Sequence, residues 1–173
     1  MEALVSGLLD LSRIEADGKL SYAVLLELNP LVQEMGEQFA SRAEQAGRDF
    51  TLELPVETIR VQADDSQLHR VLTNLLENAL KFTPAGGTVT LRLTAQADQA
   101  VLTVSDTGIG IPPDDLPRLF ERFHRGRNAS RYRGSGLGLA IVKALVDAQG
   151  GSVRAESEVG AGTSIILTIP LHP

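Results

Sequence analysis

The sequence predicts an α+β fold, a two-layer α/β sandwich in which about three helices lie on one face of a mixed five-stranded sheet. Two observations lead to this fold class. Segments with strand-like alternation come in pairs joined by short turns, and strands paired in this way must run antiparallel. Stretches with helical spacing stand between the pairs, so helices are available to cover one face of the sheet. The 173 residues suffice for one domain with a hydrophobic core.

The N-terminal segment has a pattern of its own. Residues 2–16 carry leucines at helical spacing, and Asp17-Gly18 ends that pattern. We interpret residues 1–19 as the truncated end of a longer helical unit with its linker, and residues 20–173 as the main domain. The alternative is an N-terminal helix that docks on the main domain as part of it.

The next segment combines short strands with a helix. A helix is expected from Asn29, as its N-cap, to about Ala46, because Pro30 suits a first helical turn. Asp64 or Asp65 is expected to cap a second, longer helix. Short strands are expected over residues 21–28, 49–55 and 60–63.

The second half holds a hairpin, a long loop and a final helix. The longer helix is expected to end near Phe82, and residues 107–135 are expected to be mostly loop with a short helix near residues 114–123. The last helix is expected from about Leu137 to Gln149, where a glycine pair stops it. Strands are expected over residues 88–96, 100–106, 152–158 and 163–171.

Composition excludes several classes of protein. A formal net charge of -6 argues against nucleic acid as the main partner. The absence of cysteine excludes disulfides and thiolate chemistry. No apolar run approaches the ~18 residues of a membrane span, and the first residues lack the basic and apolar regions of a secretory signal. We therefore expect no nucleic acid and no membrane contact for this sequence.

One face of the longer helix carries a polar stripe of Arg70, Asn74, Asn78 and Lys81, while apolar residues up to Phe82 cover its packed surface. Asparagine is a poor helix former because its side chain competes for the backbone, so two on one face need a reason. An amide oxygen can ligate a hard cation and lysine can hold a phosphate, which together suit Mg²⁺ with phosphate. A stripe that simply faces solvent explains this helix equally well.

Two glycine-rich segments are candidate ligand loops. Asp106 ends an apolar strand, and Gly108 and Gly110 after it allow close approach of backbone to a ligand, although a capped turn is the alternative. The second segment runs straight into the last helix, where backbone N–H groups and the helix dipole favour an anion, unless it is a flexible hinge. Its glycines are Gly134, Gly136 and Gly138. Neither segment matches the dinucleotide-binding or P-loop signature.

The segment between these loops is strongly basic. Residues 118–133 hold six arginines and a single acid, Glu121, a local excess of +5 in a chain of net charge -6. A mobile basic loop of this kind can close over a triphosphate, the alternative being a solvated surface loop. Phe120 and Phe123, with Leu119, are expected to tether its near end by packing.

The motifs occur in a specific order: "NLLENALKFTP", "DTGIGIP", "LFERFHR" and "GSGLGLAIVKALVDAQGG", followed by "SEVGAGTSIILTIP". Together they closely resemble the ATP-binding catalytic domain of sensor histidine kinases, within the GHKL ATPase superfamily, from about Leu20 to the C-terminus. The preceding "LLDLSRIEADGKL" resembles the end of the dimerisation helix hairpin of such kinases. The resemblance implies the Bergerat ATP-binding fold, ATP and Mg²⁺ as ligands, and transfer of the γ-phosphoryl group to a histidine in two-component signalling.

The resemblance also implies a role for each motif residue. Asn78 coordinates Mg²⁺, Asn74 supports the site from one turn earlier, and Lys81 reaches the phosphates. Asp106 accepts a hydrogen bond from the adenine amino group, and Arg125 is the loop residue expected at the outer phosphates. The other expected ATP-binding positions are Gly108, Gly110, Gly134, Gly136, Leu137, Gly138 and Thr163.

The phosphoacceptor is where the sequence departs from the family pattern. His69, His124 and His172 are its histidines, and none has the acidic helix-hairpin context of a phosphoacceptor. We therefore expect a fragment of a larger, cytoplasmic or membrane-anchored kinase, monomeric by itself, whose partners are its own missing hairpin and a cognate response regulator. Asn128-Ala-Ser matches a glycosylation sequon, which we discount in a cytosolic ATP lid.

Three other functions compete with this interpretation. ATP hydrolases of the same superfamily carry glutamate where this chain has Asn74, and a carboxylate, unlike an amide, can act as general base for water. A serine/threonine kinase of the anti-sigma-factor type shares the fold, but "LLDLSRIE" ahead of the domain disfavours it. Retention of every ATP motif disfavours a non-catalytic nucleotide-sensing module.

Overall fold

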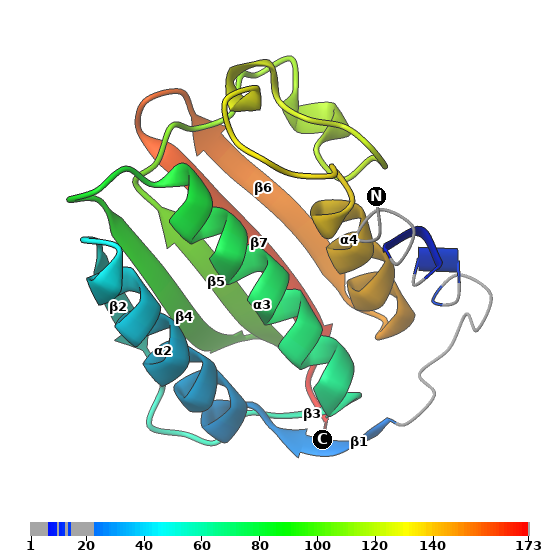
Figure 1. Ribbon diagram of the computed structural model, residues 1–173. Helices are drawn as coiled ribbons and strands as arrows, with labels where there is room; N and C mark the ends of the chain where they lie inside the picture. The colour runs from blue at the N-terminus through cyan, green and yellow to red at the C-terminus, as the bar shows by residue number, and fades with distance from the viewer. Residues whose placement is uncertain (1–6, 10, 13, 15–22, 173) are drawn as a thin grey trace.

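A mixed five-stranded sheet, covered on one face by three helices, forms the body of the computed structural model (Figure 1). The structure describes residues 7–9, 11, 12, 14 and 23–172. The strands, in spatial order, are β2 (Asp49–Glu53), β4 (Thr88–Gln96), β5 (Gln99–Asp106), β7 (Gly162–Pro170) and β6 (Ser152–Glu158). β2 pairs parallel to β4, and all the other neighbours pair antiparallel. The predicted α+β fold class is confirmed.

The three helices lie side by side over the sheet (Figure 1). They are α2 (Leu28–Gln45), α3 (Asp65–Phe82) and α4 (Gly138–Ala148). Each turns an apolar stripe inward, so that Phe39 of α2, Leu72 of α3 and Leu145 of α4 are buried. From the sheet, alternate residues of β4 such as Leu91 and Leu93 meet them. This packing fixes the positions of the ends of α3 and α4, where the candidate site lies.

A small second sheet joins the domain near the far end of β7. β1 (Val24–Glu27) pairs antiparallel with β3 (Arg60–Ala63). A single β-bridge from Val61 to Leu171 ties this pair to the chain just beyond β7. Residues 21–28 and 60–63 were both expected to contain strands, and the sequence contains no signal that separates them from the main sheet.

The predicted cap of α3 is confirmed at Asp64. This residue is 5% exposed, and its Oδ1 accepts a hydrogen bond from the backbone N–H of Gln67 at 3.2 Å. The side-chain oxygen of Gln149, at the end of α4, accepts from the backbone N–H of Asp64 at 3.3 Å. The start of α3 is therefore tied to the end of α4, and the two helices meet the sheet as a pair.

The predicted N-cap of α2 is wrong. The helix begins at Leu28 with Glu27 in the cap position, and Asn29 lies inside its first turn. The Asn29 amide donates to the backbone oxygens of Pro55 (3.2 Å) and Glu57 (3.1 Å), and its oxygen accepts from the N–H of Ile59 at 2.9 Å. Three partners from the β2–β3 connection outweigh the one N–H that a cap would satisfy.

The expected packing of the phenylalanines after residue 118 is also wrong in part. Leu119 packs against the core, but Phe123 is 53% exposed and adopts a positive φ of 62°. Its backbone N–H donates to the oxygen of Gly136 at 3.0 Å, which holds it in that left-handed conformation. The short helix expected near residues 114–123 is a single 3₁₀ turn, Leu116–Arg118.

The described residues of the N-terminal segment, 7–9, 11, 12 and 14, are helical. Leu11 is 1% exposed and belongs to the hydrophobic core. A Cβ added at Gly7 would lie 3.0 Å from Cδ1 of Leu137, so the segment packs closely against the start of α4. The rest of the expected helix over residues 2–16 lies outside the described residues. No helix within the described ranges is long and apolar enough to cross a bilayer.

Candidate functional site

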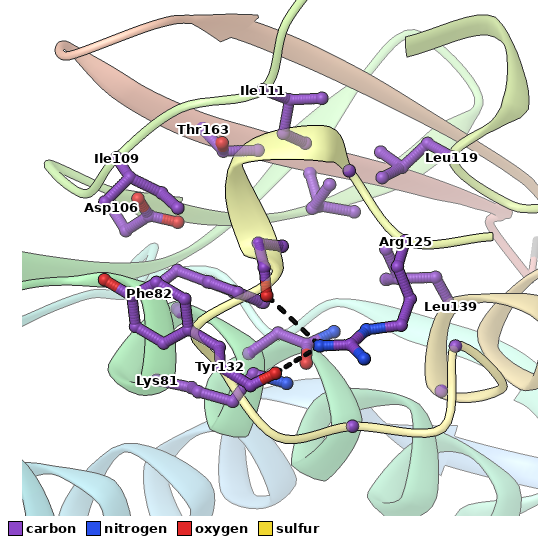
Figure 2. A pocket seen from close by; sticks show the side chains of 18 of the residues that line it. Lys81, Phe82, Asp106, Ile109, Ile111, Leu119, Arg125, Tyr132, Leu139 and Thr163 are labelled. Atoms are coloured by element: carbon purple, nitrogen blue, oxygen red, sulfur yellow. Dashed lines mark hydrogen bonds between the residues drawn. The ribbon is translucent and has the colours of Figure 1, made fainter. Parts of the chain in front are cut away.

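A cavity of about 240 Å³ lies where α3 ends and α4 begins, beneath the segment that joins the sheet to α4 (Figures 1 and 2). We call residues 116–136 of that segment the lid. The walls of the cavity are mostly apolar and come from α3, β5, β7, the start of α4 and the loops beside them. Their side chains include Leu75, Ala79, Val104, Ile109, Leu139 and Ile165. The cavity therefore offers an apolar slot with polar groups at its rim.

Two members of the polar stripe on α3 reach the cavity, and one stands behind it. Asn78 and Lys81 line it. The Asn78 amide has no hydrogen-bond partner in the part of the chain that the structure describes. Asn74 donates from Nδ2 to the backbone oxygen of Arg70 at 2.9 Å, and its Oδ1 faces Gly138. Asn74 therefore lies beside the start of α4 and is not part of the cavity lining.

Lys81 spans the space between α3 and the lid. Its Nζ donates to the backbone oxygen of Arg133 at 2.9 Å and lies 4.5 Å from the centre of the Phe82 ring. Burial lowers the pKa of Lys81, as does the nearby charge of Arg125, while Glu77 raises it. The ammonium group is therefore partly desolvated and directed toward the lid.

Phe82 forms part of the cavity and not of the core, in contrast to the packed position expected for it. Its ring lies 4.9 Å from that of Tyr132, at an interplanar angle of 59° (Figure 2). Helical periodicity cannot separate a side chain at the end of an apolar face from one that turns into a cavity. Tyr132 lies in the basic loop, where the sequence offered no periodicity to place it.

Asp106 ends β5 and brings a carboxylate to the cavity (Figure 2). Its Oδ1 accepts from the backbone N–H of Gly108 at 2.8 Å. Burial raises the pKa of Asp106 above its ordinary value, against hydrogen bonds from the backbones of Gly108 and Thr163 that lower it. Thr163 is the partner of Asp106 in the β5–β7 register and also lines the cavity.

The glycine loops have conformations or contacts that exclude a side chain. Gly110 has a φ of +68°, and a Cβ there would lie 2.0 Å from the backbone oxygen of Glu158. Gly136 has a φ of +73° and would place a Cβ 2.8 Å from the backbone of Phe123. Of the expected ATP-binding glycines, Gly110, Gly134, Gly136 and Gly138 line the cavity. Gly108 is buried behind Asp106, and Leu137 is buried at the start of α4.

Arg125 lines the cavity, but its guanidinium binds the lid itself. Nη2 donates to the backbone oxygens of Ala129, at 3.1 Å, and Tyr132 (Figure 2). The residue expected at the outer phosphates therefore holds the turn of the lid together in this structure. Arg125 and Lys81 both line the cavity, and the nearby charge of Arg125 contributes to the lowered pKa of Lys81.

Two further lid residues reach the cavity without having been predicted. Asn128, noted only as part of a sequon, donates from Nδ2 to the backbone oxygen of Gly110 at 2.9 Å. The side chain of His124 is 9% exposed, and its Nε2 lies 3.6 Å from Oδ1 of Asp115. Each contact joins residues of irregular segments that are not neighbours in the sequence. No local sequence pattern therefore predicts either contact.

Comparison with known proteins assigns the motifs to one family. Residues 63–173 match the model of the "Histidine kinase-, DNA gyrase B-, and HSP90-like ATPase" family. "Sensor histidine kinase RppB" of Synechocystis sp. is 38% identical over 99% of this chain. A structure of the "Mycobacterial sensor histidine kinase MprB" superposes with a TM-score of 0.75, at 33% identity, over 87% of this chain and 99% of that one.

A second solved structure is that of full-length ShkA in complex with AMPPNP. It superposes with a TM-score of 0.83, at 34% identity, and covers 98% of this chain but 35% of that chain. The present chain likewise spans 38% of the length of RppB. These larger proteins therefore contain substantial regions that have no counterpart in the 173 residues.

Proposed function

Because the chain belongs to the family of histidine kinase-, DNA gyrase B- and HSP90-like ATPases, we propose that it is the catalytic domain of a sensor histidine kinase. In this proposal it binds Mg-ATP and transfers the γ-phosphoryl group to a histidine on a helix hairpin outside these residues. The observation that carries the proposal is that motif residues from separate elements line the same cavity. Asn78 and Lys81 of α3, Asp106 of β5 and the glycines before α4 line one cavity.

The cavity suits adenine at one end and phosphates at the other. At the β5 end, the Asp106 carboxylate is an acceptor for an amino group between apolar walls. At the other end, the Lys81 ammonium and the backbone at Gly134 and Gly136 are donors for phosphate oxygens. Arg125 lines the same cavity and would be free to join them once its own lid contacts are released.

Asn78 is the proposed ligand of Mg²⁺. Its half-buried amide lines the cavity one turn before Lys81 and is not committed to another described residue. Mg²⁺ keeps several waters and takes much of its coordination from substrate phosphates, so one protein oxygen suits it. The ion would offset the negative charge that develops on the phosphates during transfer.

We infer transfer and not hydrolysis from Asn74. A hydrolase needs a carboxylate that can take a proton from water, and the Asn74 amide cannot do this. Its Nδ2 is moreover bonded to the backbone of Arg70, and its Oδ1 lies beside Gly138 at the start of α4. Water should therefore remain a poor acceptor for the phosphoryl group.

The partners follow from the same proposal. Residues 1–19 would be the end of the dimerisation hairpin, residues 20–173 the catalytic domain, and the phosphorylated hairpin would pass its phosphoryl group to a cognate response regulator. We place this domain in the cytoplasm, where ATP is available. RppB is named a sensor histidine kinase, which supports the proposed hairpin and response-regulator partners.

Titration calorimetry tests nucleotide binding directly. Wild-type protein should bind ATP with Mg²⁺ more tightly than ATP with a chelator, and should bind GTP weakly under both conditions. Equal affinity for ATP and GTP would contradict the adenine role of Asp106. Rapid release of phosphate by the 173-residue chain alone would favour the hydrolase instead.

A further inference from the structure

We propose that Asn128 is a positioning residue. It anchors the turn of the lid at residues 127–129, which we call the base-side end, to the loop that holds Gly110, so that the lid moves as a flap about this point when nucleotide enters. This inference rests on the proposed binding of ATP in the cavity. Asn128 donates from Nδ2 to the backbone oxygen of Gly110, at 2.9 Å, across 18 residues of irregular chain. It is half-buried and lines the cavity from the lid side.

The other end of this contact is a rigid platform. The backbone N–H of Gly160 donates to the oxygen of Ile109 at 2.9 Å, and the N–H of Ile111 donates to Oγ of Ser157 at 2.8 Å. These bonds fasten both sides of Gly110 to β6 and to the turn that follows it. The Gly110 oxygen is thus a fixed acceptor, and a lid residue bonded to it is fixed as well.

A neighbouring contact restrains the same end of the lid. The backbone N–H of Arg127 donates to Oδ2 of Asp115 at 2.9 Å, and its guanidinium donates to Asp114 at 2.8 Å. Asp115 is 6% exposed, whereas the Arg127 side chain is largely exposed. The backbone bond to the buried carboxylate is therefore the stronger part of this contact, and it leaves the Asn128 side chain aligned with Gly110.

The part of the lid around Tyr132 and Arg133, which we call the phosphate-side end, is held differently. Its contacts with α3 are the hydrogen bond from Lys81 to the backbone oxygen of Arg133 and the packing of Tyr132 against Phe82. Lys81 is the group proposed to bind phosphate, so bound ATP competes for that contact. The bond from Asn128 to the Gly110 oxygen involves none of the groups proposed to bind phosphate. Nucleotide entry therefore releases the phosphate-side end and leaves the base-side end in place.

The test compares four proteins: wild type, Asn128→Ala, Asn128→Asp and the control Ser130→Ala. Asn128→Asp keeps the size of the side chain but replaces the donor with an oxygen that faces the Gly110 oxygen. Asn128 lies in a 3₁₀ turn, Arg127–Ala129, and Ser130 follows that turn directly. Ser130 is exposed, and its side chain has no hydrogen bond within the described part of the chain. Each protein is loaded with a fluorescent ATP analogue and Mg²⁺, and release is followed by stopped flow after addition of excess ATP.

Loss of one neutral hydrogen bond predicts that Asn128→Ala releases nucleotide about two- to tenfold faster, and Asn128→Asp at least as fast. Ser130→Ala should release it at the wild-type rate, and all four should melt at the same temperature because the contact is local. Equal release rates in all four proteins, or equal acceleration by Ser130→Ala, would overturn the anchor.

Hydrogen exchange of the nucleotide-free proteins separates this inference from the proposed function. The backbone N–H of Ala129, which donates to Gly126 within the lid, should exchange about two- to tenfold faster in both Asn128 variants than in wild type. If wild type binds no nucleotide, the proposed function fails, and this measurement still decides the anchor. Unchanged exchange at Ala129 would contradict it.

Discussion

The Nζ atom of Lys81 donates a hydrogen bond of 2.9 Å to the backbone carbonyl oxygen of Arg133. A neutral carbonyl thus holds the cation that the proposed function assigns to phosphate. A phosphate oxygen is the stronger partner, because its negative charge attracts the ammonium group, whereas the carbonyl oxygen is neutral. Binding of ATP is therefore expected to exchange one partner of Lys81 for another and to loosen this end of the lid.

Replacing Lys81 should weaken the binding of ATP but not of adenosine. Lys81→Met keeps the aliphatic stem and removes the charge, so affinity for ATP should fall roughly ten- to hundredfold, as expected for a hydrogen bond to an ionised group. Titration calorimetry with ATP and with adenosine measures both. Lys143→Ala is the matched control, since Lys143 pairs with Asp147 on the exposed side of α4. Equal losses for ATP and adenosine would contradict a phosphate role.

Replacing Asn78 should remove the dependence on Mg²⁺. Asn78→Ala deletes the proposed ligand oxygen, and affinity for ATP in Mg²⁺ should fall by about tenfold or more, the loss typical even of outer partners of a metal. Affinity measured with a chelator should hardly change. Thr73→Ala, on α3 and outside the cavity, is the control. A variant that still responds to Mg²⁺ as wild type does would rule out Asn78 as the ligand.

Asp106 should couple stability to pH. Burial raises the pKa of its carboxyl above the ordinary 3.8. The stabilising contribution of the protonated group is therefore complete below pH 3.8 and is lost as pH rises through the raised value. Asp106→Asn does not titrate at this position. As pH rises through that window, the free energy of unfolding of wild type should therefore fall relative to that of the variant. At higher pH the difference between the two proteins should stay constant. Urea denaturation at a series of pH values measures this difference, and a constant difference would contradict it.

The same substitution, Asp106→Asn, should damage adenine recognition. The oxygen of the new amide would stay with the N–H of Gly108, so its NH₂ group would face the adenine amino group. Two opposed donors leave both groups unpaired, which should weaken ATP binding roughly ten- to hundredfold. Competition with the fluorescent ATP analogue measures this loss. Unchanged affinity would indicate that the base lies elsewhere.

Asn29 should matter for stability and not for nucleotide binding. Its amide satisfies three backbone groups of the β2–β3 connection, so Asn29→Ala should lower the free energy of unfolding by about 1–3 kcal/mol. Urea denaturation measures the change, and Gln33→Ala on the exposed face of α2 serves as control. A loss no larger than that of Gln33→Ala would show that these bonds contribute little.

Regular elements were predictable because their signals are local. The alternation of residues 88–96 predicted the strand β4, and Asp64 or Asp65 was expected to cap α3 because both stand before an apolar helix. Asn29 was misassigned because an asparagine before proline looks like a cap. Its true partners are up to 30 residues away in sequence, where no local pattern extends.

The candidate site shows the same difference between residues on regular elements and residues in the irregular lid. Asn78, Lys81 and Asp106 lie in the ordered motifs that carry the family resemblance, and that resemblance predicted a common site for them. The structure brings all three to one cavity. The lid has no periodicity, and its contacts depend on which backbone oxygens face inward. Asn128 and Tyr132 were therefore missed, although both line the cavity.

The central claim is transfer of phosphate to histidine by this ATP site. The most direct measurement incubates the 173-residue protein with γ-labelled ATP, Mg²⁺ and a helix hairpin that carries a phosphoacceptor histidine, with Asn78→Ala as control. Wild type should place an acid-labile, alkali-stable label on the hairpin, and the variant should place none. Label appearing as free phosphate without any phosphohistidine would contradict it.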